Sequence, residues 1–454
     1  MAQTNGHTRN GNTSPSKKLH FIIVGGSLGG LAAGLALKDL GHDTTILERN
    51  PEKLLHNQGA GIVAGGDSLE FLERYNRCDR PVAVTSQRRQ YFNKDGSIVH
   101  EKVMTQNMTS WDLTYFLMRA NYDGVESNYC AALEPLPHHG KAVHLHGHKV
   151  TSFETKPEGG VRVFYTDSSR TGSDETKSMD ADILVAADGP SSAIRSMLYP
   201  ETKRTFAGYC ALRGTVPEHA VSQPTLEAFR ERFAFFHAPG IQILAYLIPG
   251  ANGTVELGQR LINFVYYTNF PEGSKELDEI LTGKDGVRHR ITMPPGKTDP
   301  KAWEKQKQIA RERLPPQFAE IVCGTKAPFV QAITDVPPPP ANSAFDDRLV
   351  LIGDALAGFR PHTVASTSQA CFDAMTYADY IAGKISNEEW KKQTMGYARV
   401  VQDRGVKMGI RSQFGEQDEN GNWQALSLEE MIKDRDEASV PRKEQVWPEW
   451  ATRI

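Results

Sequence analysis

One glycine-rich string constrains the fold of this chain more than any other feature. An apolar run, Phe21–Val24, leads into the sequence GGSLGG at residues 25–30, and an apolar helical pattern follows it. Gly25 permits a tight turn after the strand, and Gly30 permits the helix to pack closely against that strand. The helix N-terminus then offers free N–H groups and the positive end of its dipole to a pyrophosphate. This order of elements predicts a dinucleotide-binding unit.

The residues next to this string indicate which parts of a dinucleotide they contact. Ser27 stands where the pattern usually has its second glycine, and we expect it to lie at the phosphates with Leu28. A second predicted strand, Thr44–Leu47, ends at Glu48, whose carboxylate would accept hydrogen bonds from ribose hydroxyls. An acid there favours an unphosphorylated ribose, and the adjacent Arg49 weakens that preference. The alternative is a glycine-rich turn of an ordinary α/β domain.

Two further apolar runs have the character of the first. Ile183–Ala187 and Leu349–Ile352 each lead into a turn of small residues and then into a helical pattern. Such runs are typical of buried parallel strands, and their alternation with helices is typical of a doubly wound sheet. More than 150 residues separate consecutive runs. We therefore predict an α/β fold in which a Rossmann-like nucleotide-binding domain is discontinuous.

The remaining segments indicate how the chain is divided. Aromatic-rich segments such as Gly240–Pro249 and Leu261–Asn269 resemble strands of a mixed β-sheet, and Pro337–Pro340 cannot lie inside an element. We predict a disordered tail over residues 1–18, the nucleotide-binding domain over 19–205 and 337–385, a substrate domain over 206–336, and a helical C-terminal extension over 386–454. In that extension we expect four packing anchors: Trp390, Trp423, Trp447 and Trp450.

A carboxylate follows the third apolar run. Asp354 comes directly after this run, and the carboxyl end of a parallel strand faces the ligand crevice. The side chain could bind a hydroxylated chain such as ribitol. After Pro361, the residues Ala365, Ser366 and Thr367 begin a helical pattern whose N–H groups would point at an anionic part of the ligand. The alternative role for Asp354 is that of a helix N-cap.

Composition excludes several classes of protein. The net charge of −3 argues against a general nucleic-acid binder, and no apolar run approaches the roughly 20 residues of a membrane span. The five cysteines are scattered and form no CxxC, so they indicate neither a disulfide framework nor a zinc site. A reduced, cytoplasmic compartment fits them best. The sequence gives no clear sign of an oligomer and leaves a homodimer open.

Together these segments resemble the class A flavoprotein monooxygenases, the 4-hydroxybenzoate hydroxylase-like group. The string at residues 25–30 is similar to the ADP-binding fingerprint of that family. The sequence ADGPSSAIR at 187–195 looks like its DG motif, and the resemblance implies that Asp188 takes part in cofactor binding. GDA at 353–355, with Pro361, looks like its GD motif, whose aspartate holds the flavin ribitol. Within the group, the chain is most similar to the 2,6-dihydroxypyridine 3-hydroxylase subgroup.

The resemblance implies a specific reaction. FAD would be the bound cofactor, and NAD(P)H would bind transiently to reduce it, because the chain has one ADP-binding fingerprint. O2 would then add at flavin C4a, and the terminal oxygen of the hydroperoxide would pass to a small electron-rich aromatic ring, such as a phenol, a hydroxypyridine or an aromatic acid. Binding and orienting the cofactor and excluding water would be the work of the protein.

Oxygen transfer of this kind is electrophilic, so the site should offer a base or a polar relay to the substrate oxygen. Candidates for this role are His362, Tyr246 and Arg213, followed by His237, Gln242 and Tyr267. His362 is favoured because Pro361 would fix it beside the flavin. Each has a structural alternative: the tyrosines as core or sheet residues, His237 as a surface residue, and Arg213 as a partner in a salt bridge.

Two other functions remain open at this point. A related enzyme could epoxidise an indole or an alkene natural product, since a fold does not determine a substrate. A non-catalytic FAD-binding module is the second alternative. A flavin-dependent halogenase is disfavoured, because the chain has no Trp-x-Trp-x-Ile-Pro string.

Overall fold

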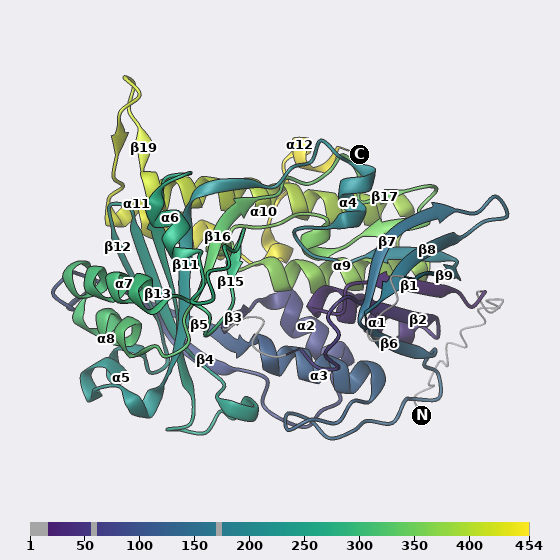
Figure 1. Cartoon of the computed structure of the whole chain (residues 1–454), viewed down its shortest axis with the longest axis horizontal. Helices are drawn as coiled ribbons and strands as arrows, with labels where there is room; N and C mark the ends of the chain where they lie inside the picture. Colours follow the sequence, from purple (N-terminus) through teal and green to yellow (C-terminus); the bar gives the residue numbers. More distant parts are fainter. Residues whose placement is uncertain (1–16, 56–60, 169–174, 454) are drawn as a thin grey trace, which may run out of the picture.

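The computed structural model describes residues 17–55, 61–168 and 175–453. The tail predicted for residues 1–18 lies outside these ranges except for its last two residues. Two large sheets stand side by side, each covered by helices (Figure 1). The long helix α10 (Asn387–Phe414) extends along one side of both sheets, and it contacts α9 (Ser366–Ile381) as well as strands of the larger sheet.

The smaller sheet brings the three predicted apolar strands together. Strand β1 (His20–Val24) pairs in parallel with β10 (Ile183–Ala186), which pairs in parallel with β18 (Leu349–Leu351). The predicted doubly wound arrangement is therefore confirmed. The sheet is completed by β2 (Asp43–Glu48), β6 (Ala142–His146) and the antiparallel edge strand β17 (Ser343–Ala344).

Helices cover the smaller sheet because its strands are apolar on both faces. Helix α1 (Leu28–Asp39) is buried along nearly its whole length, and it packs against α9 and α3 (Trp111–Asp123). The remaining helices of this part are α2 (Gly66–Tyr75) and α4 (Ala193–Leu198). A separate three-stranded sheet adds apolar side chains to the other face and consists of β7 (His148–Thr155), β8 (Val161–Asp167) and β9 (Thr176–Ala181).

The larger sheet has nine strands and is mostly antiparallel. Its central strands are β11 (Thr205–Pro217), β14 (Leu261–Asn269), β13 (Ile241–Ile248) and β12 (Arg232–Ala238). One edge is formed by β15 (Thr292–Met293) and β16 (Phe329–Asp335), the other by β4 (Val84–Phe92), β5 (Ile98–Ser110) and β3 (Gly61–Ala64). The sheet thus draws strands from both sides of the boundary that we place at residue 206.

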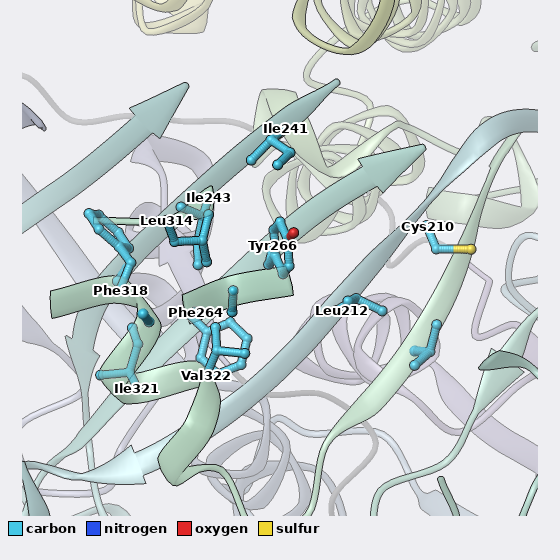
Figure 2. Packing of buried hydrophobic residues seen from close by; sticks show 14 of the residues in the cluster. Cys210, Leu212, Ile241, Ile243, Phe264, Tyr266, Leu314, Phe318, Ile321 and Val322 are labelled. Atoms are coloured by element: carbon cyan, nitrogen blue, oxygen red, sulfur yellow. The ribbon is translucent and has the colours of Figure 1, made fainter. Parts of the chain in front are cut away.

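Alternation along β13 assigns the two faces of this sheet. Ile241 and Ile243 lie on the face that packs against α7 (Pro300–Arg313) and α8 (Pro316–Gly324), and Figure 2 shows Ile243 close to Phe318. Helices α5 (Gln223–Phe229) and α6 (Lys275–Ile280) add to this layer. Side chains at the intervening positions of β13, such as Tyr246, lie on the opposite face, toward the C-terminal elements.

The C-terminal extension is not wholly helical. Between α10 and α11 (Leu428–Ala438) the chain forms a hairpin of β19 (Glu416–Gln417) and β20 (Trp423–Gln424), and it ends in α12 (Glu449–Thr452). Trp390 is buried and Trp447 packs on Tyr397, as expected of anchors. Trp423 and Trp450 are 53% and 50% exposed, so the expectation is wrong for these two.

One disulfide contradicts the inference from cysteine spacing. Cys78 and Cys130 are joined, although 52 residues separate them in the sequence. The pairing arises because Leu113, Leu117 and Ala120 of α3 form a small apolar cluster with both cysteines, a proximity that spacing alone does not show. Among the described residues, no helix has both the length and the apolar character needed to cross a membrane.

Candidate active site

The glycine turn has the geometry that its sequence predicts. Gly25 has a φ of +105°, and a Cβ there would lie 2.4 Å from the carbonyl oxygen of Ala187. A Cβ on Gly30 would lie 1.8 Å from the carbonyl oxygen of Gly25. Only glycine fits either position. Ser27 precedes α1 without capping it, so the first N–H groups of this helix remain available to a ligand.

Glu48 lies directly beside this turn. Its carboxylate accepts hydrogen bonds from the backbone N–H groups of Gly26, at 2.7 Å, and of Asn50, at 2.8 Å. The side chain is 8% exposed, whereas Arg49 points to solvent. The acid therefore supports the glycine turn and retains lone pairs for ribose hydroxyls.

The carboxylate of Asp354 has one unsatisfied oxygen. It lies in a short 3-10 turn, Gly353–Ala355, directly after β18. Among the described residues, its buried Oδ1 has no hydrogen-bond partner. Burial raises the pKa of Asp354 to about 6, an effect that the positive charges of Arg204 and Arg195 partly oppose. A buried acceptor without a partner fits a ligand that supplies hydroxyl donors, as a ribitol chain does.

The DG segment connects two of the predicted motifs. Oδ2 of Asp188 accepts a hydrogen bond from the N–H of Ala193 at 2.8 Å, which fixes the start of α4. The guanidinium of Arg195 donates to the carbonyl oxygens of Ala355, at 2.7 Å, and of Pro190, at 2.6 Å. Asp188 thus shapes the loop, and Gly189 and Pro190 of that loop line the central cavity.

The start of α9 faces the same cavity. Pro361 lies in a 3-10 turn, and Ala365, Ser366 and Thr367 line the cavity where the 16-residue helix begins. The positive end of the helix dipole therefore points at this space. Val364 has a φ of +51°, which costs a β-branched residue about 1–3 kcal/mol. Such strain is characteristic of functional sites.

A single cavity of about 350 Å³ joins these motifs to the larger sheet. From the nucleotide-binding side it is lined by Ser27, Leu28, Gly189, Pro190, Asp354 and Pro361, with the first residues of α9. From the sheet it is lined by Arg213, Tyr246, Tyr267 and Gln331. The backbone of β3 approaches Tyr246 of β13 so closely at this cavity that only glycine fits at position 61. A Cβ on Gly61 would lie 2.7 Å from the ring of Tyr246.

The sheet side of the cavity offers hydrogen-bond donors and one cation. Burial raises the pKa of Tyr267 to about 12 and raises the pKa of Tyr246 as well, although the positive charge of Arg213 opposes both shifts. Both phenols therefore stay protonated at neutral pH. The Tyr267 hydroxyl is buried and has no partner among the described residues. Nη1 of Arg213 lies 3.5 Å from Oε1 of Gln331, and its guanidinium lies 5.3 Å from the centre of the Phe329 ring.

His362 does not line the cavity and lies behind Tyr267. Its ring stacks on Tyr267 with 4.2 Å between ring centres, and its Nε2 is 2.9 Å from the hydroxyl of Tyr209. Burial lowers its pKa well below the usual value, with the positive charges of Arg435 and Arg360 acting in the same direction. The imidazole is therefore neutral, and its position lets it act on the cavity through Tyr267.

The other predicted polar residues lie farther along the same sheet face. Nε2 of His237 is 3.4 Å from Nε2 of Gln242, and both residues line a space of about 10 Å³ beside His362. Neither residue lines the central cavity. Both were candidates because they lie in the predicted substrate domain, and their distance along the sheet separates them from the flavin motifs.

Arg204, Trp111 and Gln331 are among the cavity residues that were not anticipated from the sequence. Arg204 donates hydrogen bonds to the hydroxyls of Thr334 and Ser191, both at 2.7 Å, and its charge acts on Asp354. Trp111, the first residue of α3, and Gln331 of β16 also line the cavity. None of the three belongs to a recognisable motif, and the folded arrangement of β16, of α3 and of the residue before β11 brings them to the site.

Comparison with known proteins agrees with this geometry. Residues 18–210 match the family described as FAD binding domain, and residues 206–335 match FAD binding domain-like. A 2,6-dihydroxypyridine 3-monooxygenase of Paenarthrobacter nicotinovorans is 26% identical, over 88% of this chain and 94% of the relative. A 3-amino-4-hydroxybenzoate 2-monooxygenase of Streptomyces cremeus is 26% identical, over 52% of this chain and 55% of the relative.

Solved structures share the fold. The 2,6-dihydroxypyridine-3-hydroxylase of Arthrobacter nicotinovorans superimposes with a TM-score of 0.74 at 23% identity, covering 91% of this chain and 98% of the other. A Klebsiella pneumoniae protein complexed with FAD and uric acid gives a TM-score of 0.63 at 16% identity, covering 93% and 92%. The cofactor of this chain is accordingly FAD, and the chain is an FAD-dependent monooxygenase that is similar to the class A flavoprotein monooxygenases.

Proposed function

We propose that this enzyme hydroxylates a small, electron-rich aromatic ring, using NAD(P)H as a transient reductant and O2. One observation carries the proposal: a single cavity joins the flavin motifs to Arg213, Tyr246 and Tyr267. The substrate class is a phenol, a hydroxypyridine or an aromatic acid. The relative that is named for 2,6-dihydroxypyridine makes this compound the first to test.

The residues present fit FAD. The glycine turn and the start of α1 would hold the pyrophosphate, Glu48 the adenosine ribose, and Asp354 the ribitol. The N–H groups at the start of α9 would face the flavin ring. When bound, FAD supplies the redox chemistry, taking electrons from the nicotinamide and delivering oxygen to the substrate.

The sheet residues would bind and polarise the substrate. Tyr246 and Tyr267 are protonated and can donate hydrogen bonds to a ring oxygen. Arg213 would stabilise negative charge on that oxygen, which raises the electron density of the ring toward an electrophile. His362 acts as a positioning residue, because its ring holds that of Tyr267 in place.

The test is a screen of phenols, hydroxypyridines, aromatic acids and indoles for faster NAD(P)H oxidation, with mass spectrometry of the products. Arg213→Met should lower kcat/KM for the best substrate by about tenfold to hundredfold, the value of a hydrogen bond to a charged group. Arg230→Met, at an exposed arginine outside the cavity, is the matched control. A product that is an epoxide, or an Arg213→Met enzyme that behaves like the control, would contradict the proposal.

A further inference from the structure

A second cavity, of about 650 Å³, lies on the same face of the nine-stranded sheet as the central cavity. On the side of the sheet it is lined by Phe235 and His237 of β12. On the opposite side it is lined by the end of α10, by β20 and by α11. Its volume is within the range of small-molecule sites, roughly 300–1,000 Å³. The 10 Å³ space lined by His237 and His362 lies between this cavity and the wall of the active site.

Aromatic side chains line the second cavity. The rings of Tyr91 and Phe235 are stacked, with 5.2 Å between their centres and 21° between their planes. Across the cavity, Phe414 lies 6.1 Å from Trp423, whose side chain is 53% exposed. A half-exposed tryptophan on a hairpin contributes little to the core. Walls of this kind bind flat aromatic rings by stacking and edge contacts.

Unsatisfied polar atoms accompany these rings. Among the described residues, Oε1 of Gln413, Oδ1 of Asn269, the hydroxyl of Tyr91 and Nδ1 of His237 are buried without a hydrogen-bond partner. Gln413 and Tyr91 are 2% and 1% exposed. Nδ2 of Asn269 donates to the backbone oxygen of Gln413 at 2.9 Å, which leaves its Oδ1 free to accept. Buried acceptors without partners indicate a ligand that brings donors.

The charge of the cavity favours an uncharged ligand. Arg411 lines the cavity, but its guanidinium is paired with the carboxylate of Asp434 at 2.7 Å and with that of Glu416. The two carboxylates more than compensate its charge, so Arg411 offers no free positive charge to an anionic ligand. The polar groups that can select a ligand are then the amide oxygens of Gln413 and Asn269, which accept hydrogen bonds from hydroxyl or amino groups.

We propose that this cavity is a second binding site for an uncharged aromatic compound that carries hydroxyl or amino groups, separate from the flavin cavity. Two kinds of observation carry it: stacked rings around a ligand-sized space, and buried acceptors in its wall. The proposal does not depend on the reaction at the flavin, because none of the residues that line the second cavity lines the first.

The test measures binding of resorcinol, an uncharged aromatic diol, to the oxidised holoenzyme by equilibrium dialysis without reductant. Ala425→Trp places a large side chain in the second cavity from an exposed position and should abolish resorcinol binding there. Ala425→Ser should retain that binding. Gln413→Leu removes one acceptor at similar volume and should weaken this binding by about threefold to tenfold. Thermal unfolding of each variant confirms that it is folded.

The outcomes separate this site from the active site. Binding that survives Arg213→Met but is lost in Ala425→Trp supports the proposal, even where resorcinol is not hydroxylated. Binding that is unchanged in both Ala425→Trp and Gln413→Leu, or that is absent at millimolar resorcinol, overturns it. Binding that is lost only in Arg213→Met would assign resorcinol to the flavin cavity and also overturn it.

Discussion

Replacing Asp354 by asparagine should change stability and cofactor affinity in opposite directions. The carboxylate has a buried oxygen without a partner, and burial raises its pKa from 3.8 to about 6. An acid whose pKa is raised by folding holds its proton more tightly in the folded chain than in the unfolded chain. The FAD-free protein therefore loses stability from this group as pH rises between about 4 and 6, where the carboxylate ionises.

The magnitude follows from the difference between the two pKa values. At about 1.4 kcal/mol for each pH unit, ionised Asp354 costs the FAD-free protein about 2–3 kcal/mol of unfolding free energy above pH 6. Asp354→Asn removes the ionisation and should recover up to this amount. The same change removes a charged acceptor for ribitol, so FAD should bind about tenfold to hundredfold more weakly near pH 8. Affinity of the wild-type protein for FAD should fall as pH drops through 6.

Urea unfolding of the FAD-free proteins across this pH range, together with FAD titrations, measures both effects. Asp347→Asn is the control of opposite sign, because Lys391, 2.7 Å away, helps to hold the pKa of Asp347 below its usual value despite partial burial. That variant should lose stability at neutral pH. An Asp354→Asn protein that is less stable than wild type near pH 8, or a stability difference that does not vary with pH, would refute the reasoning.

Further variants test the rest of the site. Gly30→Ala should destabilise the protein by about 3 kcal/mol through its backbone clash, whereas Gly29→Ala, whose Cβ would lie 3.8 Å from the Cβ of Ala370, should behave like wild type in urea unfolding. His362→Ala should lower kcat about tenfold in stopped-flow assays while the FAD Kd changes less than about threefold, because the ring supports a cavity tyrosine; equal losses would indicate a cofactor contact. Cys78→Ser, or reduction of its bond to Cys130, should cost about 2–4 kcal/mol of unfolding free energy, and insensitivity of wild type to a reductant would show that the bond is not formed.

The nucleotide-binding half of the fold could be predicted because its signals are local. An apolar run followed by a turn of small residues specifies a buried strand, and the strand-end rule then places Asp354 at the crevice. The pattern predicts β1 and β10 as parallel strands of one sheet, although 158 residues lie between Val24 and Ile183, and the structure shows that the two are neighbours. By contrast, β3 to β5 join the larger sheet through pairing across the whole chain, which no local pattern encodes.

The catalytic side of the site could be predicted only in part. Alternation along β13 places Gln242 and Tyr246 on one face, and the sequence cannot show how far along this face the flavin lies. Of the three catalytic candidates, Arg213 and Tyr246 line the cavity, while His362 lies behind Tyr267. The position of the His362 ring depends on the direction of its side chain within a 3-10 turn, which the sequence does not show.

Three features that local reasoning cannot explain lie at the flavin cavity. Val364 is strained, and Oδ1 of Asp354 and the hydroxyl of Tyr267 are buried without a hydrogen-bond partner among the described residues. Each feature lowers the stability of the FAD-free protein, and all three residues line the same cavity. A bound cofactor and substrate would supply the missing hydrogen bonds. These three destabilising features are therefore best explained as groups arranged for ligands.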